Sequence, residues 1–171
     1  MKVTVVLRTC NRPNFFKEAL ASVGLQTHSD WEILIFDDGA SVENFSIYND
    51  FKSKHTNKRI MYITTKDSYD LFRSSWLMAP DLAEGEIMVR LDDDDILAED
   101  CLEFLSKLYT DNPELEFSYG SSVLFNENEL TTLMQTQTPY EAPKTTAEWE
   151  AYTIPNNHPW THPWRFVQNY Y

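Results

Sequence analysis

The sequence predicts an α/β domain with a mostly parallel sheet flanked by helices. Short apolar runs of strand length alternate with longer amphipathic runs of helical length over residues 3–109. The short runs are apolar at nearly every position, as in strands that are buried on both faces. Four strand–helix repeats in this order are typical of parallel strands joined by right-handed crossovers.

Four apolar runs are predicted as strands. They are residues 3–7, 31–36, 59–64 and 87–91. Each is far shorter than the roughly 20 apolar residues that span a bilayer, so we expect no transmembrane segment. In parallel sheets covered by helices, ligands bind at the carboxyl ends of the strands.

Each predicted strand is followed by a run with apolar residues at helical spacing. The first helix is expected at residues 13–25, with Pro13 in its first turn and Asn11 or Asn14 as its cap. A weaker helix is expected at residues 42–54. Two more are expected, one at residues 68–82 that Pro80 must bend or end, and one at residues 98–109.

The C-terminal part differs from this repeat in composition. Threonines and prolines dominate from residue 130 onward, and residues 149–171 are rich in aromatic side chains. We expect an irregular, aromatic-rich segment that packs on the sheet as a lobe or lid. Its aromatic residues can line a pocket for an acceptor substrate, form part of the hydrophobic core, or make an interface between copies of the chain. The sequence leaves these three alternatives open.

Size and charge exclude several classes of protein. The 171 residues, 42% of them hydrophobic, are expected to form a single domain over residues 1–171. The 14 Lys and Arg against 27 Asp and Glu give a net charge of -13, so nucleic acid is not expected as a partner. No secretion signal is recognisable before the first strand, so a cytoplasmic location is expected. Cys10 and Cys101 fit neither a metal nor a disulfide pattern and are expected to be free thiols.

Several well-known sequence motifs are absent from the chain, and their absence disfavours some classes of enzyme. The chain has only 4 glycines and contains neither the glycine-rich dinucleotide fingerprint nor a P-loop. It also lacks the GxSxG and HExxH motifs. Oxidoreductases that use dinucleotides and P-loop nucleotidases are therefore disfavoured.

Four consecutive aspartates, Asp92 to Asp95, directly follow the fourth predicted strand. Like charges about 4 Å apart repel by about 1 kcal/mol in water, and by more in a half-dry site, so a cation would relieve the cost. If the strand continues outward, Asp92 and Asp94 share a face and offer hard oxygen ligands to Mg²⁺ or Mn²⁺ beside a diphosphate. The alternative is a set of solvated charges at the positive end of the next helix. The place of the run at the end of a buried strand favours the metal site.

Polar residues after the first two strands are expected at the same edge of the sheet. Asp37 and Asp38 precede Gly39, and they either build a tight turn or accept hydrogen bonds from a base N–H or a ribose hydroxyl. Two interpretations are open for three arginines, Arg8, Arg12 and Arg73. They either bind phosphate or pair with nearby aspartates.

Three motifs occur in order along the chain. VTVVLRTCNRP at residues 3–13 is similar to VSVIIPTYNRP, and DWEILIFDDG at residues 30–39 is similar to WELIVVDDGS. AEGEIMVRLDDDD at residues 83–95 is similar to A.GEYI.FLDADD. Through these motifs the chain resembles the family 2 glycosyltransferases, which are inverting enzymes of the GT-A fold. The resemblance implies a Rossmann-like sheet with a nucleotide-sugar-binding part at residues 1–125 and a partial acceptor-side segment at residues 126–171.

The resemblance implies roles for individual residues. In the family the first loop and the aspartates after the second strand hold the nucleotide, which points to Thr9 and to Asp38 as partner of the base. The acidic motif holds ribose and a metal-bridged diphosphate. Asp92 and Asp94 are therefore the expected metal ligands, with Asp94 the first choice for direct contact. The expected donor-binding residues are Arg8, Thr9, Arg12, Asp37, Asp38, Arg73, Asp92 and Asp93.

The chain also departs from the family pattern. Arg8 replaces the usual proline or small residue and Cys10 the usual aromatic residue, so we expect a nucleotide pocket of different shape. Relative to the family the chain is short at its C-terminal end, where the carboxylate that acts as general base is usually found. Possible substitutes are Glu148, Glu150, His158 and His162, although the two histidines, each followed by proline, are also typical of ordinary loop residues.

The function that the resemblance implies is metal-dependent transfer of a sugar, with inversion, from a nucleotide-diphosphate sugar to an acceptor hydroxyl. A UDP-sugar is the preferred donor, Mn²⁺ or Mg²⁺ the expected cofactor, and the acceptor is not identified. One alternative is a truncated or degenerate family member that binds nucleotide and metal without catalysis. Another is a nucleotidyltransferase on a related sheet, which would release pyrophosphate.

Overall fold

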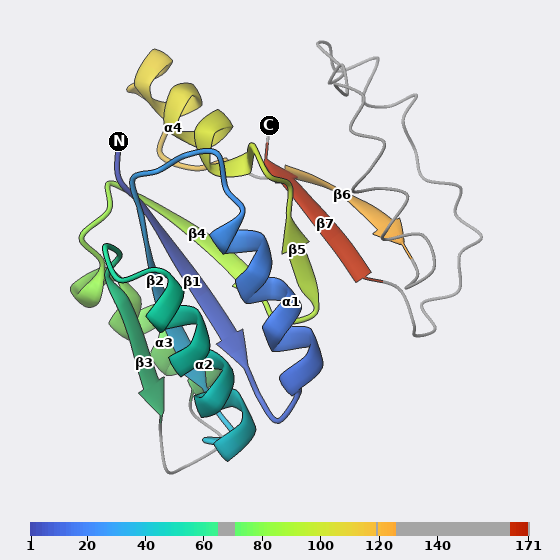
Figure 1. Cartoon of the computed structure of the whole chain (residues 1–171). Coiled ribbons are helices and arrows are strands. Elements are labelled where there is room, and N and C mark those ends of the chain that lie inside the picture. The colour runs from blue at the N-terminus through green and yellow to red at the C-terminus, as the bar shows by residue number, and fades with distance from the viewer. Residues whose placement is uncertain (65–70, 119, 126–164, 171) are drawn as a thin grey trace.

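The computed structural model describes residues 1–64, 71–118, 120–125 and 165–170. Strands and helices alternate as the sequence predicts, and a second group of strands follows them (Figure 1). In chain order the elements are β1 Val3–Thr9, α1 Pro13–Gly24, β2 Trp31–Asp37, α2 Val42–Lys54, β3 Ile60–Thr64, α3 Leu71–Leu82, β4 Ile87–Asp92, β5 Asp95–Leu97, α4 Cys101–Asp111, β6 Gly120–Phe125 and β7 Arg165–Tyr170.

The first four strands form one parallel sheet in the order β3-β2-β1-β4. This confirms the predicted parallel α/β sheet. The chain first moves from β1 through β2 to β3 and then returns to place β4 on the other side of β1. The carboxyl ends of β1 and β4 therefore flank the point where the direction of winding reverses, which is the usual ligand position in open α/β sheets.

Both faces of this sheet are covered (Figure 1). On one face, β1 side chains such as Val5 and Leu7 pack with α1, α2 and α4 in a cluster that includes Phe16, Phe51 and Leu102. On the other face, Val6, Leu34 and Phe36 pack against Ala79 of α3. Burial on two faces explains why the strands are apolar at nearly every position.

The start of α1 differs from the sequence prediction. Pro13 occupies the first helical position as expected, but the N-cap residue is Arg12, and no side chain caps the helix. Asn11 has a left-handed backbone with φ of 52° and lies against Gly39, so neither Asn11 nor Asn14 caps α1 as predicted. In contrast, α2 has the predicted bounds, and the Ser41 hydroxyl accepts a hydrogen bond from the Asn44 backbone.

A second, smaller sheet was not predicted from the sequence. β5 begins at Asp95 and pairs in parallel with β7, which pairs antiparallel with β6. Residues 165–170 of the C-terminal segment, which was expected to be irregular, thus form a strand. The rest of that segment, residues 126–164 and 171, lies outside the described residues.

The amino end of the main sheet carries a buried acidic residue, Glu32 of β2, which is 0% exposed. Its carboxylate accepts hydrogen bonds from the Thr4 hydroxyl at 2.6 Å, Arg59 Nη1 at 2.6 Å and the Gly85 backbone N–H at 3.0 Å. A Cβ on Gly85 would collide with the backbone of Thr4, so this approach requires glycine. Burial alone would raise the pKa of Glu32. The hydrogen bonds from Thr4, the Glu84 backbone N–H and Arg59, together with the Arg59 charge, outweigh burial and lower the pKa below its usual value.

Candidate functional site

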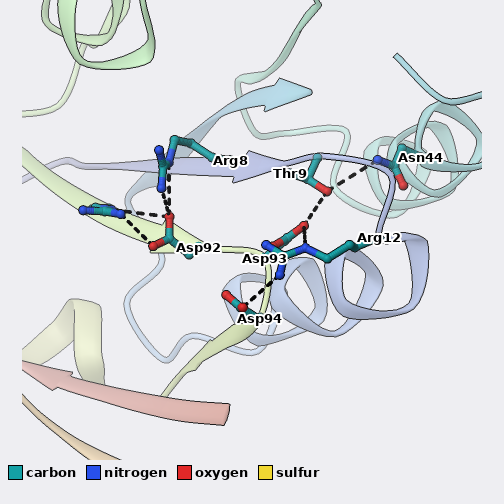
Figure 2. Close-up of polar contacts among 8 residues, drawn as sticks. Arg8, Thr9, Arg12, Asn44, Asp92, Asp93 and Asp94 are labelled. Carbon is teal, nitrogen blue, oxygen red and sulfur yellow. Dashed lines mark hydrogen bonds and ion pairs between the residues drawn. The ribbon is translucent and has the colours of Figure 1, made fainter. Parts of the chain in front are cut away.

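The candidate site lies at the carboxyl ends of β1 and β4 (Figure 2). Arg8 and Asp92 are partners in the register of these two strands. Beyond them the chain turns, so that the residues after β1 and the acidic run after β4 meet. Three aspartates and three arginines gather here; we call them the arginine–aspartate cluster, made of Arg8, Arg12, Arg90, Asp92, Asp93 and Asp94.

Asp92 is held between two arginines. Arg8 donates to its Oδ1 from Nη2 at 2.6 Å and from Nε at 3.1 Å. Arg90 donates to its Oδ2 from Nη2 at 2.8 Å. Burial alone would raise the pKa of Asp92, but the bonds and charges of the two arginines outweigh it and lower the pKa below its usual value. Asp92 is therefore ionised at neutral pH.

Asp93 is the buried member of the cluster, with a side chain that is 0% exposed. It accepts from the Thr9 hydroxyl at 2.8 Å and from Arg12 through both Nε, at 3.2 Å, and Nη2. Burial raises the pKa of this carboxyl, against the effects of Thr9 and Arg12. Thr9 in turn receives a weak hydrogen bond from Asn44 Nδ2 at 3.4 Å, which connects α2 to the cluster (Figure 2).

Asp94 is the more open member, with 37% of its side chain exposed. Arg12 Nη1 donates to its Oδ2 at 2.9 Å. β4 ends at Asp92, and Asp93 and Asp94 lie in the turn before β5. The alternation that would put Asp92 and Asp94 on one face of a continuing strand therefore stops, and the two carboxylates bind different arginines.

The repulsion within the acidic run is relieved by arginines in this structure. Of these, Arg8 and Arg12 were candidates from the sequence, and both pair with aspartates. Arg90 was missed. Its signal is its position two residues before Asp92 on the same strand, which places both side chains on one face of the sheet. The alternative that the aspartates cap α4 does not hold, because α4 starts only at Cys101 and has no side-chain cap.

Asp37 has the turn-building role. Its buried carboxylate accepts from the backbone N–H groups of Gly39 at 2.9 Å and Ala40 at 3.2 Å, from Asn44 Nδ2 at 3.2 Å, and from the Tyr62 hydroxyl. Burial and the bond to Asp37 raise the pKa of Tyr62 well above its usual value. All four hydrogen-bond donors belong to the protein itself. Asp37 therefore stabilises the loop that carries its neighbour Asp38.

Asp38 differs from Asp37 in having an unsatisfied atom. Its Oδ1 is buried and has no hydrogen-bond partner among the described residues, and the same holds for Asn44 Oδ1. Its backbone N–H donates to the Thr9 carbonyl at 2.9 Å, so this turn and the arginine–aspartate cluster share Thr9. Burial and the charge of Asp37 raise the pKa of Asp38. A buried acceptor without a donor costs stability unless a ligand supplies the donor.

The donor set fits a divalent cation that arrives with phosphates. Within the described part of the chain, no group of three or more His, Cys, Asp or Glu residues could hold a metal ion alone. Mg²⁺ and similar ions usually take one or two carboxylates together with substrate phosphates. Asp94, with its partly exposed oxygens, can supply such a carboxylate, and Asp92 a second if its arginines shift.

Several candidates from the sequence lie outside what the structure describes. Arg73 lies in α3, and nothing is described of its side chain. Glu148, Glu150, His158 and His162, the substitutes for a general base, lie outside the described residues. Asn44 was missed because a polar residue in the first turn of a helix gives no ligand signal in the sequence.

A family described as Glycosyl transferase family 2 matches residues 4–166 of the chain. The chain belongs to this family. It is a glycosyltransferase domain in which each of the three motifs runs along one strand of the main sheet and ends beyond its carboxyl end. Within the described residues, no helix of this family 2 domain is long and apolar enough to cross a membrane. The expected cytoplasmic location remains a prediction.

Curated relatives are longer than this family 2 chain. It is 34% identical over 126 residues to an uncharacterized glycosyltransferase of Rickettsia felis, with 74% of this chain and 20% of the relative covered. Protein CgeD of Bacillus subtilis is 28% identical over 134 residues, with 75% of this chain and 31% of the relative covered. The chain thus spans between a fifth and a third of the length of these two relatives.

Solved structures share the fold of this domain. S. aureus TarS 1-349 in complex with UDP has a TM-score of 0.59 at 19% identity and covers 74% of this chain and 35% of its own. A mannosyltransferase from Pyrobaculum calidifontis, in complex with GDP-Man and Mn2+, has a TM-score of 0.58 at 22% identity. The match covers 65% of this chain and 33% of the mannosyltransferase chain. These likenesses confirm the GT-A type of α/β fold.

Proposed function

We propose that the chain binds a nucleotide-diphosphate sugar at the carboxyl ends of β1 and β4 and transfers the sugar to an acceptor hydroxyl. The observation that carries this proposal is the buried Oδ1 of Asp38, which has no hydrogen-bond partner in the described part of the chain. The turn that holds Asp38 contacts Thr9, and Thr9 also binds Asp93 of the arginine–aspartate cluster. One end of the site thus offers an acceptor to a base N–H, and the other offers charges suited to a diphosphate and cation.

The nucleotide has a defined orientation in this proposal. The base lies at Asp38, whose carboxylate accepts from an N–H such as that of uracil or guanine. The ribose and diphosphate run toward Asp92, Asp93 and the arginines beside them. UDP is the first candidate; the fold neighbours include one complex with UDP and one with GDP-Man, so GDP is the second.

A divalent cation, Mn²⁺ or Mg²⁺, completes the proposed site. Asp94 would hold it, with Asp92 as second ligand, and a solved fold neighbour contains Mn2+. When bound, it neutralises the charge that develops on the leaving nucleoside diphosphate. Inversion requires a base on the acceptor side, and we retain Glu150, His158 and His162 as candidates for it.

A second candidate function is nucleotide binding without catalysis. The observation that favours it is that arginines occupy both carboxylates of the expected metal pair. The two functions differ in one measurement, the release of free nucleoside diphosphate from UDP-glucose or GDP-mannose in the presence of Mn²⁺. Release above the protein-free rate supports transfer or hydrolysis, whereas nucleotide binding without release supports the second function.

The Asp38→Ala variant tests the base position. We expect it to weaken UDP or GDP binding by about 10-fold to 100-fold, because a charge-assisted hydrogen bond is lost. We also expect an unchanged or higher melting temperature, because the variant removes a carboxylate with an unsatisfied buried oxygen. Calorimetric titration with UDP and GDP, with and without Mn²⁺, measures the first effect and a thermal melt the second.

A matched control for this variant is Asp50→Ala, which removes an exposed aspartate on α2. It is expected to leave nucleotide affinity unchanged. Equal affinities for wild type and Asp38→Ala would show that Asp38 does not contact the base.

Protection of Cys10 provides a readout that needs no turnover. Cys10 is exposed and lies between Thr9 and Asn11, whereas Cys101 is buried. Partial desolvation of the thiol by its surroundings and the negative charges of Asp38 and Asp37 raise the pKa of Cys10. Its alkylation by a maleimide is therefore expected to be slow at neutral pH. We expect a saturating nucleoside diphosphate with Mg²⁺ to slow it several-fold further, as measured by intact mass. An unchanged rate would place the nucleotide away from this loop.

A further inference from the structure

The arginine–aspartate cluster is balanced in formal charge. Its three carboxylates face three guanidinium groups, so the charges sum to zero. An acidic motif is expected to attract cations, but here each aspartate already has a cationic partner. A bare divalent cation therefore meets little net attraction at this place.

Arg12 is the arginine that contacts the expected metal ligand. One edge of its guanidinium, Nε and Nη2, binds the buried carboxylate of Asp93. The remaining nitrogen, Nη1, donates to Asp94 at 2.9 Å. The two-point bond to Asp93 fixes the orientation of the planar group, so Nη1 is directed at Asp94.

From this geometry we propose that Arg12 takes the place of the divalent cation at Asp94, so that the chain retains the cation only together with a nucleoside diphosphate. This inference rests on the proposed function. It adds that binding of the cation depends on binding of the nucleoside diphosphate. A cation and the Nη1 group cannot both lie close to the same Asp94 oxygen, because both are positive. A cation that binds Asp94 Oδ2 must therefore break the hydrogen bond between this oxygen and Nη1.

The diphosphate changes this balance. The formal charge of the cluster is zero, and adding a divalent cation alone turns it to +2. A diphosphate brings at least two negative charges and returns the cluster to zero or to a net negative charge. Arg12 stays bound to Asp93 through Nε and Nη2, so the Asp94 carboxylate turns from Nη1 to the cation. Nη1 then becomes available to a phosphate oxygen.

The experiment is a titration of the protein with Mn²⁺ alone, followed by the electron paramagnetic resonance signal of the free ion. We expect Arg12→Gln to bind Mn²⁺ about tenfold or more tightly than wild type, because a positive charge beside Asp94 is removed. The double variant Arg12→Gln/Asp93→Asn keeps the net charge and avoids an unpaired buried carboxylate, and the same gain is expected. Adding Asp94→Asn to Arg12→Gln is expected to abolish the gain.

The control for net charge is Lys54→Gln, which removes an exposed lysine on α2 and leaves the cluster intact. It is expected to bind Mn²⁺ like wild type. Equal nucleotide-free Mn²⁺ affinities for wild type and both Arg12 variants would overturn the proposal, as would a gain that survives Asp94→Asn.

The same titration with UDP or GDP present separates this inference from the proposed function. We expect nucleotide to strengthen Mn²⁺ binding to wild type more than to Arg12→Gln. If neither nucleotide strengthens Mn²⁺ binding to wild type, the proposed function fails, whereas the nucleotide-free titration still decides whether Arg12 competes with the cation at Asp94.

Discussion

The Asp94→Asn variant is expected to lose about 100-fold or more of the Mn²⁺-dependent affinity for UDP or GDP. Asparagine keeps the size of the side chain but removes the charge that a hard divalent cation requires. Calorimetric titration of both nucleotides, with and without Mn²⁺, gives the affinity ratio. The expected loss appears only in the presence of Mn²⁺, since Asp94 acts on the nucleotide through the cation.

Stability separates this expectation from a general loss of structure. The ion pair of Asp94 with Arg12 joins two side chains that are 37% and 43% exposed, so its loss is expected to cost less than about 1 kcal/mol of the free energy of unfolding. Asp100→Asn is the matched control, because Asp100 is exposed and makes no side-chain cap on α4. If Asp94→Asn binds nucleotide with Mn²⁺ as tightly as this control, the metal assignment is wrong.

The Glu32→Ala variant is expected to lower the free energy of unfolding by about 3 kcal/mol or more. The change leaves the Thr4 hydroxyl and the Glu84 backbone N–H without their buried acceptor, and it removes the buried carboxylate that Arg59 binds. For a chain of this size such a loss lowers the melting temperature by roughly 6–12 °C. Urea unfolding of wild type and variant measures it directly.

Glu84→Ala is the control within the same group of charges. Glu84 is 56% exposed and pairs with Lys2 and Arg59, so its loss is expected to cost less than about 1 kcal/mol. Similar losses of unfolding free energy for both variants would mean that the burial of Glu32 does not increase its contribution to stability.

The contribution of Glu32 also depends on pH. Its pKa is lower in the folded chain than in the unfolded chain, so its stabilisation is complete above the unfolded value of about 4.3. It is lost as the pH falls below this value through the folded-state pKa. The difference in unfolding free energy between wild type and Glu32→Gln is therefore expected to be constant near neutral pH and to shrink below about pH 4.

Much of the fold could be predicted because burial on two faces leaves a clear pattern. The strand beginning at Trp31 is apolar except at Glu32 and at its end, and α2 has the bounds that were predicted for it. β5 could not be predicted, since three residues are too few for a periodic signal and its pairing partner, β7, lies far along the chain. The cap of α1 failed because Asn11 takes a left-handed turn instead.

The site was predictable in its location but less so in its contacts. The acidic run and the residues after β1 do meet, because parallel strands end at one edge. Side-chain directions beyond Asp92 depend on the turn that follows β4, which the period of a strand does not encode. The pairing of Asp92, Asp93 and Asp94 with arginines is likewise a three-dimensional result. Sequence reasoning assigned the relief of repulsion to a cation and left the pairing of Arg8 and Arg12 with aspartates as one of two interpretations.

The two halves of the site depend on strand pairs of very different separation along the chain. The Asp38 turn meets Thr9 when β2 pairs with β1, its neighbour in sequence. The bonds of Arg8 to Asp92 and of Thr9 to Asp93 span 84 residues and exist only once β4 has paired with the other side of β1. A folding chain that holds only β1, β2 and β3 thus has the Asp38 turn, the proposed site for the base, but none of the three aspartates of the arginine–aspartate cluster. Closing such a long loop is slow, so on the proposed function nucleotide contacts at Asp38 become available before the aspartates that would hold the cation.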